Sequence, residues 1–78
     1  MDDLEKFLRK LSKKERMILA EEVFPRILRL QLSGLDVKKM KGMAVWRLRH
    51  GKMRVLFVKD KGRGIIIRIG YRKDVYHN

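Results

Sequence analysis

The sequence contains no cysteine and a single proline among its 78 residues. The absence of cysteine excludes a disulfide framework and a cysteine-based zinc site. The two histidines, His50 and His77, are too few for a convincing metal site, so we expect neither a metal nor another cofactor. No apolar run approaches the roughly 20 residues that span a bilayer, and the start Met1-Asp2-Asp3 is unlike a signal peptide. A cytoplasmic protein without membrane contact is therefore expected.

Acidic residues are also scarce. The chain has 21 Lys and Arg against 9 Asp and Glu, which gives a net charge of +12. Ten basic and two acidic residues follow residue 42, so the charge is concentrated in the second half. Such charge repels itself and favours a polyanionic or acidic partner, and the alternative is a basic surface without a ligand. Hydrophobic residues make up 45%, which at this length predicts one domain over residues 1–78.

The first half of the chain has the apolar spacing of helices. Four apolar residues recur at intervals of three and four: Leu4, Phe7, Leu8 and Leu11. This spacing predicts a helix over 3–11. Ser12 and Glu15 match a capping box and predict a second helix over 13–32. Pro25 removes a backbone donor inside that helix, so we expect a kink or a restart beside it.

From residue 43 the apolar period changes to two, which predicts strands over 43–50, 53–59 and 64–70. The last of these is rich in isoleucine and is expected to be central or well covered. The predicted fold class is α+β, with an N-terminal helical hairpin packed on a twisted antiparallel sheet of about three strands. The residues expected to be most buried between the layers are Trp46, Leu48, Phe57 and Ile67, facing Leu8, Met17, Phe24 and Ile27.

Arginines gather on the opposite face of the predicted sheet. Arg47 and Arg49 alternate with the apolar residues of their strand, so they point away from the helices. Arg54 and Arg68 come from the neighbouring strands. Planar guanidinium groups on rigid strands can bind several phosphates at fixed positions. The alternative is a solvated face on which arginine serves solubility, but the number of basic residues exceeds that need.

Three segments in this order resemble the RelE/ParE toxin superfamily. They are K-K-M-K-G at 38–42, W-R-L-R-H-G-K-M-R-V-L-F at 46–57 and I-G-Y-R-K-D-V-Y at 69–76. They are similar to the family's connector between helix and sheet, its hairpin and its closing segment. Members usually begin with a strand before the helices; this sequence starts at the first helix, so that strand is either missing or not included, and an exposed sheet edge is expected. Tyr71 stands where many members have histidine.

The resemblance implies the toxin of a type II toxin–antitoxin system that inhibits translation. Such an mRNA interferase is an endoribonuclease that cleaves ribosome-bound mRNA without a metal, through attack of the 2′-hydroxyl on the adjacent phosphate. Arg54 and Arg72 would stabilise the phosphate, with Arg47 as a further cation, and Tyr76 would stack on a base or handle a proton. The other residues expected to bind RNA are Arg49, Lys52, Arg68, Lys73 and His77. The implied protein partner is an acidic antitoxin, partly disordered when free.

Two other functions stay open. The ParE branch inhibits DNA gyrase and generally lacks the full set of arginine and tyrosine residues used for RNA cleavage. This chain retains Arg54, Arg72 and Tyr76, which favours RNA cleavage over gyrase inhibition. The third function is a non-catalytic basic nucleic-acid-binding relic, which a missing first strand would fit. Tyr76 has the alternative role of anchoring the tail on the sheet, and His77 that of a frayed penultimate residue.

Overall fold

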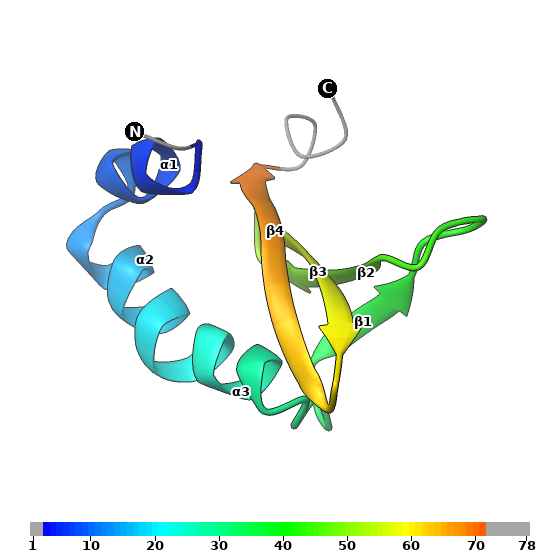
Figure 1. The fold of residues 1–78 in the computed structure, drawn as a ribbon. Helices are drawn as coiled ribbons and strands as arrows, with labels where there is room; N and C mark the ends of the chain where they lie inside the picture. The colour runs from blue at the N-terminus through cyan, green and yellow to red at the C-terminus, as the bar shows by residue number, and fades with distance from the viewer. Residues whose placement is uncertain (1–2, 72–78) are drawn as a thin grey trace.

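The computed structural model describes residues 3–71, which form a helical layer on one face of a four-stranded antiparallel sheet (Figure 1). The helical elements are α1 (Asp3–Lys10), α2 (Lys13–Ile18), the π-helical segment η1 (Leu19–Val23) and α3 (Phe24–Leu28). The strands are β1 (Asp36–Lys39), β2 (Trp46–His50), β3 (Met53–Asp60) and β4 (Arg63–Tyr71), paired in sequence order. The predicted α+β class and antiparallel sheet are confirmed. Within the described residues, no helix is long and apolar enough to cross a membrane.

The second helical stretch, from α2 to α3, follows its local sequence closely. The Ser12 hydroxyl accepts a hydrogen bond from the Glu15 N–H, and the Glu15 carboxylate accepts one from the Ser12 N–H, both at 3.1 Å. Pro25 lies in the first turn of α3, where it has no N–H to donate to the preceding turn. The helix accommodates it through the π-helical turn, in which Phe24 N–H donates to the Leu19 carbonyl five residues earlier. The predicted irregularity at this point is therefore confirmed as a widened turn.

This helical stretch ends at Leu28 and not at residue 32 as predicted. Leu30 adopts the left-handed conformation with φ 53°, and the N–H of Gln31 donates to the Arg26 carbonyl at 2.8 Å. This geometry is that of a Schellman-type helix end, which usually has glycine at the left-handed position. The Arg26 side chain then donates from Nε to the Gln31 carbonyl at 2.9 Å, which fixes the chain as it leaves the helix.

The sheet has one more strand than the three predicted. β1 pairs with β2 along its whole length, although its sequence D-V-K-K has a single apolar residue and so no alternation to detect. The strand predicted over 43–50 begins only at Trp46, because the preceding residues form the loop of the β1–β2 hairpin. In that loop Met40 N–H donates to the Val45 carbonyl at 2.8 Å, and Met43 N–H donates to the Met40 carbonyl at 3.2 Å.

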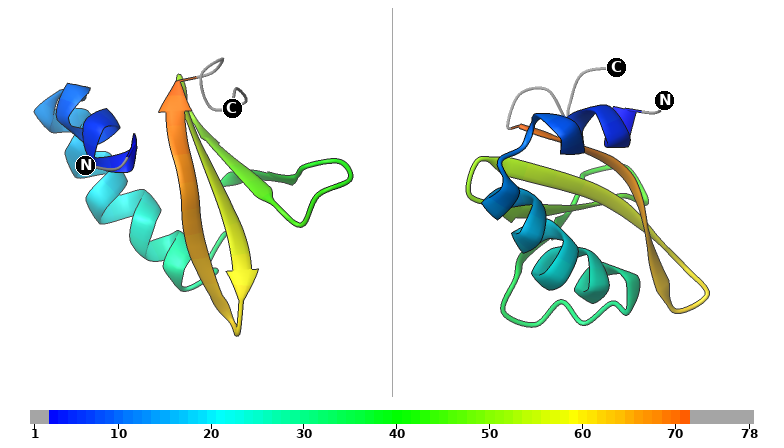
Figure 2. Two further views of the ribbon diagram at one scale, coloured as in Figure 1. Left: turned by 45° about the horizontal axis from the view of Figure 1, so that its top comes forward. Right: turned by 90° about the vertical axis from the view of Figure 1, so that its left-hand side faces the viewer.

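β4 was expected to be central or well covered, and it lies at an edge of the described sheet with one face covered by helices. The helical layer covers one face of this strand, while the green β1–β2 hairpin extends away from the helices (Figure 2). The Phe7 ring of α1 packs edge-on against Tyr71 with 5.1 Å between ring centroids. Near the other end of β4, Gly64 lies so close to α3 that a Cβ would overlap the Ile27 carbonyl. Helical cover therefore explains the apolar residues on one face of this edge strand.

A register shift in the β3–β4 ladder changes which isoleucine faces the helices. Leu56 pairs with Arg68 and Phe57 with Ile66, so Ile67 is the extra residue of a bulge. Ile67 is 52% exposed, and its predicted burial was wrong. Alternation alone cannot locate such an insertion, because the shift depends on the pairing with the neighbouring strand.

The core lies between the helical layer and β2, β3 and β4. Its fully buried side chains are Leu19, Val23, Ile27, Leu48, Val55 and Phe57. Leu8 and Phe24 pack against this cluster as predicted and are partly buried. Trp46 is also only partly buried, because it begins β2 at the border of the core. Met17 is 47% exposed and was wrongly predicted to face the sheet, because it points away on the outer side of its helix.

Candidate nucleic-acid interface

The outer face is the face of the sheet turned away from the helices. Leu48, Val55 and Ile69 pair across the strands and belong to the core, so the residues alternating with them occupy the outer face. Strand pairing arranges this face in two neighbouring rows. One row consists of Lys38, Arg47, Leu56 and Arg68, and the other of Asp36, Arg49, Arg54 and Gly70. The register thus places all four predicted arginines on one face.

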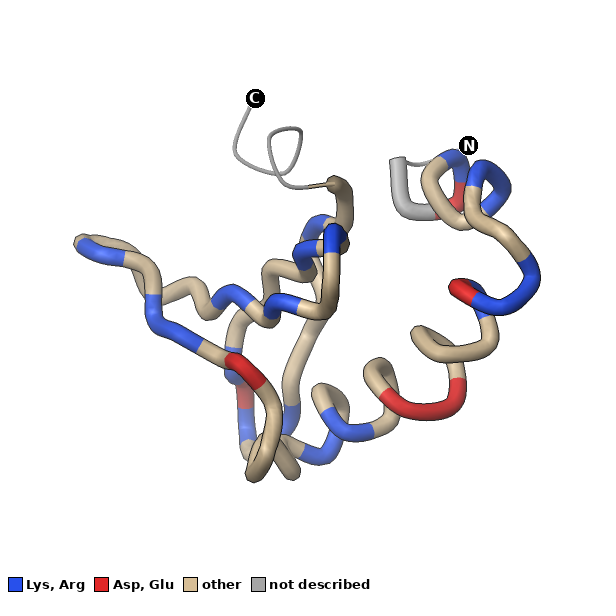
Figure 3. Tube along the Cα trace, turned by 180° about the vertical axis from the view of Figure 1, so that it is seen from behind, with Lys and Arg blue, Asp and Glu red and all other residues tan. Residues whose placement is uncertain are grey.

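Basic residues recur along the strands, whereas several of the described acidic residues lie on the helices (Figure 3). Arg49 and Arg54 are direct cross-strand partners, and Arg47 lies diagonally from Arg54. Neighbouring strands are about 4.8 Å apart, so these three side chains start from adjacent points of the sheet. Like charges at such positions destabilise the sheet. A bound anion would remove that repulsion.

Arg54 is buried in spite of its charge, with 6% of its surface exposed. Its Nη1 donates to the Gly51 carbonyl at 2.7 Å and to the Met53 carbonyl at 2.9 Å. Both acceptors are neutral, so they fix the guanidinium in place without cancelling its charge. Because Nη1 carries two hydrogens, both are used in these bonds, and the Nε–H and Nη2 donors have no acceptor among residues 3–71. That pair of donors forms the edge with which arginine binds phosphate through two parallel bonds.

Arg49 differs from Arg54 in being exposed. Its Nε lies 3.8 Å from the Asp36 Oδ2 across the β1–β2 ladder. An exposed pair of this kind contributes little to folding stability. It does draw the Arg49 side chain toward β1 and away from Arg54, which reduces the repulsion between the two cations. Asp36 is thereby the acidic neighbour of Arg49 on this face.

Arg47 is half-buried, and its Nε atom is buried without a hydrogen-bond partner among the described residues. Buried polar atoms in proteins nearly always have a partner, so an unpaired guanidinium nitrogen marks a place where an acceptor can bind. Arg47 also lines a depression of about 430 Å³ at the end of the β1–β2 hairpin. The other lining residues are Lys38, Lys39, Met40 and Lys41.

Trp46 begins β2 on the helix-facing side of the sheet, where it pairs with Phe57 and has two lysines over its ring. The Lys59 Nζ is 4.3 Å from the ring centroid, and the Lys39 Nζ is 5.8 Å from it. The Phe57 ring stacks on Trp46 with 6.4 Å between centroids. Sequence reasoning missed Lys39, which also lines the depression, as a site residue. The available signal was the density of lysine at 38–41, which was interpreted as a connector.

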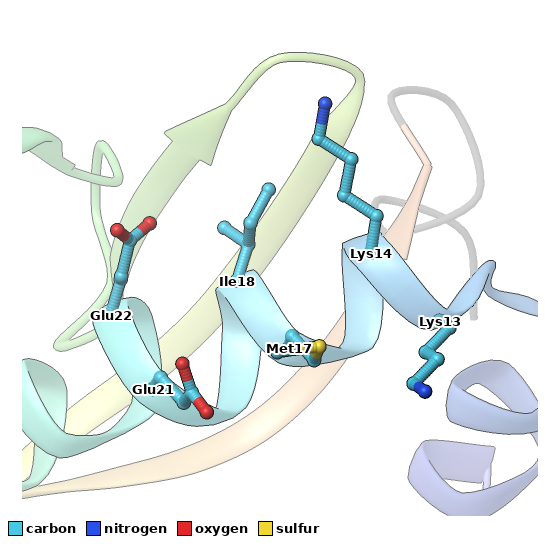
Figure 4. A pocket seen from close by; sticks show the side chains of 6 residues that line it. All are labelled: Lys13, Lys14, Met17, Ile18, Glu21 and Glu22. Atoms are coloured by element: carbon cyan, nitrogen blue, oxygen red, sulfur yellow. The ribbon is translucent and has the colours of Figure 1, made fainter.

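Another depression lies on the exposed surface of α2 and η1 (Figure 4). It is lined by Lys13, Lys14, Met17, Ile18, Glu21 and Glu22. The lysines stand at one end and the glutamates at the other, so a phosphate placed here would meet carboxylates. The mixed charge makes this surface a poor candidate for a polyanion and leaves the outer face as the stronger one.

The remaining predicted site residues divide into two groups. Lys52 is exposed in the β2–β3 turn beside the Gly51 carbonyl that Arg54 binds, and Arg68 is half-buried on β4. The others lie outside the described residues: Arg72, Lys73, Tyr76 and His77. In the part of the chain that the structure describes, no three His, Cys, Asp or Glu residues are grouped so as to hold a metal ion. The described part of the site is thus an arrangement of cations.

Comparison of the chain with models of known protein families, with curated proteins and with solved structures finds no match. Its function is therefore inferred from the residues of the outer face and from the motifs of the sequence.

Proposed function

We propose that the chain is an RNA-cleaving toxin of the RelE type that binds the phosphate backbone of mRNA on its outer face. The observation that carries this proposal is Arg54. Its buried guanidinium is held by two neutral carbonyls, keeps its charge, and retains the donor edge suited to phosphate. Arg49 and Arg47, at the opposite and diagonal positions, supply further positive charge to the same place.

The proposed reaction needs what this arrangement offers. Attack of the RNA 2′-hydroxyl on the adjacent phosphorus forms the new P–O bond of a cyclic phosphate and breaks the bond to the 5′-oxygen. Negative charge grows on the phosphate oxygens, and donors fixed in advance stabilise it at no cost of reorganisation. Arg54 is fixed in this way by its carbonyl partners. By resemblance, Arg72 joins it on the phosphate, and Tyr76 contacts the base or moves a proton.

The architecture supports the RelE-like assignment. Helices pack on one face of an antiparallel sheet, and the motif arginines of the described strands lie on the other face. The proposed setting is the cytoplasm, where ribosome-bound mRNA is the substrate. The assignment extends to residues 72–76, whose motif follows β4 directly.

An acidic antitoxin is the proposed protein partner. The net charge of +12 and the row of outer-face cations favour a partner with many carboxylates, which folds as it binds. Expression of the chain alone should stop growth, and co-expression with its antitoxin should restore growth and allow the two proteins to be purified together. Growth at the normal rate during expression of the folded chain alone would argue against the pairing.

The deciding experiment compares two activities of the purified protein. Cleavage of an mRNA is followed by primer extension in a reconstituted translation reaction, with and without ribosomes. Inhibition of supercoiling by DNA gyrase is measured in parallel. Discrete cuts in the message without gyrase inhibition support the proposal. Gyrase inhibition without cuts would reassign the chain to the ParE type, and binding to RNA without either activity would make it a non-catalytic binding protein.

A further inference from the structure

We infer that the β1–β2 hairpin carries a second phosphate-binding site for single-stranded RNA, formed by Lys38, Lys41 and Arg47 with Lys39 at its rim. We call it the hairpin subsite. It deepens the proposed function and rests on it, because its ligand is the continuation of the same RNA strand. None of its three lysines belongs to the site that the motifs predict.

The hairpin loop holds its lysines in a defined geometry. Met43 N–H donates to the Met40 carbonyl at 3.2 Å, and Gly42 has φ +74°. A turn with a left-handed third residue is of type II, which places Lys41 at its second position. The Met40 N–H bond to Val45 closes the base of the loop at 2.8 Å. Lys41 is therefore carried on a closed turn beside the depression.

The electrostatics of the depression favour an anion. Lys38 and Arg47 are direct cross-strand partners, and Lys39 and Lys41 complete a lining of four cations and one methionine. No carboxylate of residues 3–71 lines it, and Asp36, the acidic residue of β1, is paired with Arg49. The buried Nε of Arg47 adds a donor that has no acceptor among the described residues. A phosphate bound among these side chains would relieve the repulsion between the cations.

Arg47 connects this subsite with Arg54. It stands between the lysines of β1 and the diagonal position of Arg54 on β3, so the cations form a continuous path across the outer face. A single strand can follow such a path with successive phosphates, which is how basic grooves bind single-stranded nucleic acid. A very short RNA occupies the Arg54 end alone, whereas a longer RNA reaches the hairpin subsite as well.

The test measures binding of labelled 2′-O-methyl RNA, which lacks the attacking hydroxyl and so stays intact. A dinucleotide and a decanucleotide are titrated against the full chain by fluorescence anisotropy at several salt concentrations. The variant is Lys38→Gln/Lys41→Gln, and its matched control is Lys6→Gln/Lys10→Gln on exposed positions of α1. For the hairpin variant we expect decanucleotide affinity to fall about tenfold and the salt slope to lessen by roughly 1.4, for two lost phosphate contacts. Dinucleotide affinity and the circular dichroism spectrum should not change.

Three results would overturn the inference. If the hairpin variant binds the decanucleotide with the affinity and salt slope of the α1 control, the subsite is wrong while the proposed RNA function stands. If the hairpin variant loses the same affinity for both lengths, the lysines act only through net charge. If the unaltered chain binds neither oligonucleotide and cleaves no message, the proposed function fails together with the subsite.

Discussion

The guanidinium of Arg54 is buried and donates hydrogen bonds to two carbonyls at the β2–β3 turn. A substitution of Arg54 therefore affects folding as well as the proposed chemistry. Truncation to alanine removes the donor to both carbonyls, and leaving the buried one, that of Met53, unpaired typically costs about 1–3 kcal/mol of folding free energy. A loss of activity in Arg54→Ala is therefore ambiguous. A variant that keeps the cation and changes only its shape separates the two effects.

Arg54→Lys is expected to lower the rate of mRNA cleavage by about 10²–10³-fold, because a lysine ammonium cannot replace the paired donors of a guanidinium at the transition state. Thermal melting followed by circular dichroism should still show a cooperatively folded protein. Arg63→Lys, at an exposed position of β4, serves as the matched control and should cleave at the normal rate. Cleavage by folded Arg54→Lys at that same rate would remove Arg54 from the reaction.

Gly64 of β4 lies against the backbone of α3, which leads to a separate prediction about stability. A Cβ at Gly64 would overlap the Ile27 carbonyl, which belongs to helical backbone and cannot move without shifting α3. Overpacking of this kind costs about 1–3 kcal/mol. We expect Gly64→Ala to lower the free energy of unfolding by that amount in urea titrations. Arg63→Ala, one residue away and exposed, should change it by less than about 0.5 kcal/mol.

At the scale of elements, the start of α2 depends on one hydroxyl. Ser12 and Glu15 satisfy each other's backbone N–H groups, and α1 ends just before this cap. Ser12→Ala should lower the free energy of unfolding by about 1 kcal/mol, whereas Ser12→Asp keeps an acceptor at the cap. For a domain of this size, 1 kcal/mol lowers Tm by roughly 4–8 °C, which a thermal melt resolves. Equal melting of both variants would show that the cap contributes nothing.

The elements that could be predicted are those whose signals are local. Helix starts follow caps, and β2, β3 and β4 follow runs of apolar residues with turns between them. β1 was missed because its pairing with β2 is tertiary and its one apolar residue gives no period. The end of α3 was missed because Leu30 takes a conformation that favours glycine. The bulge at Ile67 depends on the facing strand, which no local pattern reveals.

In the candidate site, too, the features that could be predicted are those with a local sequence signal. Alternation along β2 correctly predicted that Arg47 and Arg49 point away from the helices. The burial of Arg54 and the unpaired Nε of Arg47 depend on how the strands pack together, so neither could be predicted from local patterns. The lysines at the end of the hairpin enter the candidate site only because β1 exists as a strand that brings them beside Arg47.

At the scale of the whole molecule, the charge of +12 acts in two opposite directions. Close cations repel one another in the folded chain, which lowers its stability. The same cations attract a polyanion and release its counterions on binding. Salt weakens both effects, because the Debye length falls from about 30 Å at 0.01 M to about 8 Å at 0.15 M ionic strength. Folding and RNA binding should therefore respond to salt with opposite signs.

We expect the Tm of the free protein to rise as sodium chloride is increased from 0.01 M to 0.15 M, because screening relieves the repulsion among the outer-face cations. Over the same range the affinity for single-stranded RNA should fall steeply, with a slope of log K against log salt concentration of about −0.7 for each phosphate bound.

Sodium sulfate at equal ionic strength distinguishes screening from specific anion binding. If sulfate occupies the sites of Arg54 and Arg47, it should raise Tm beyond the effect of chloride, since a ligand of the folded state stabilises it by mass action. A Tm that falls with both salts would mean that interactions within the folded protein already neutralise the repulsion among these cations. The outer face would then have no unfilled anion-binding site.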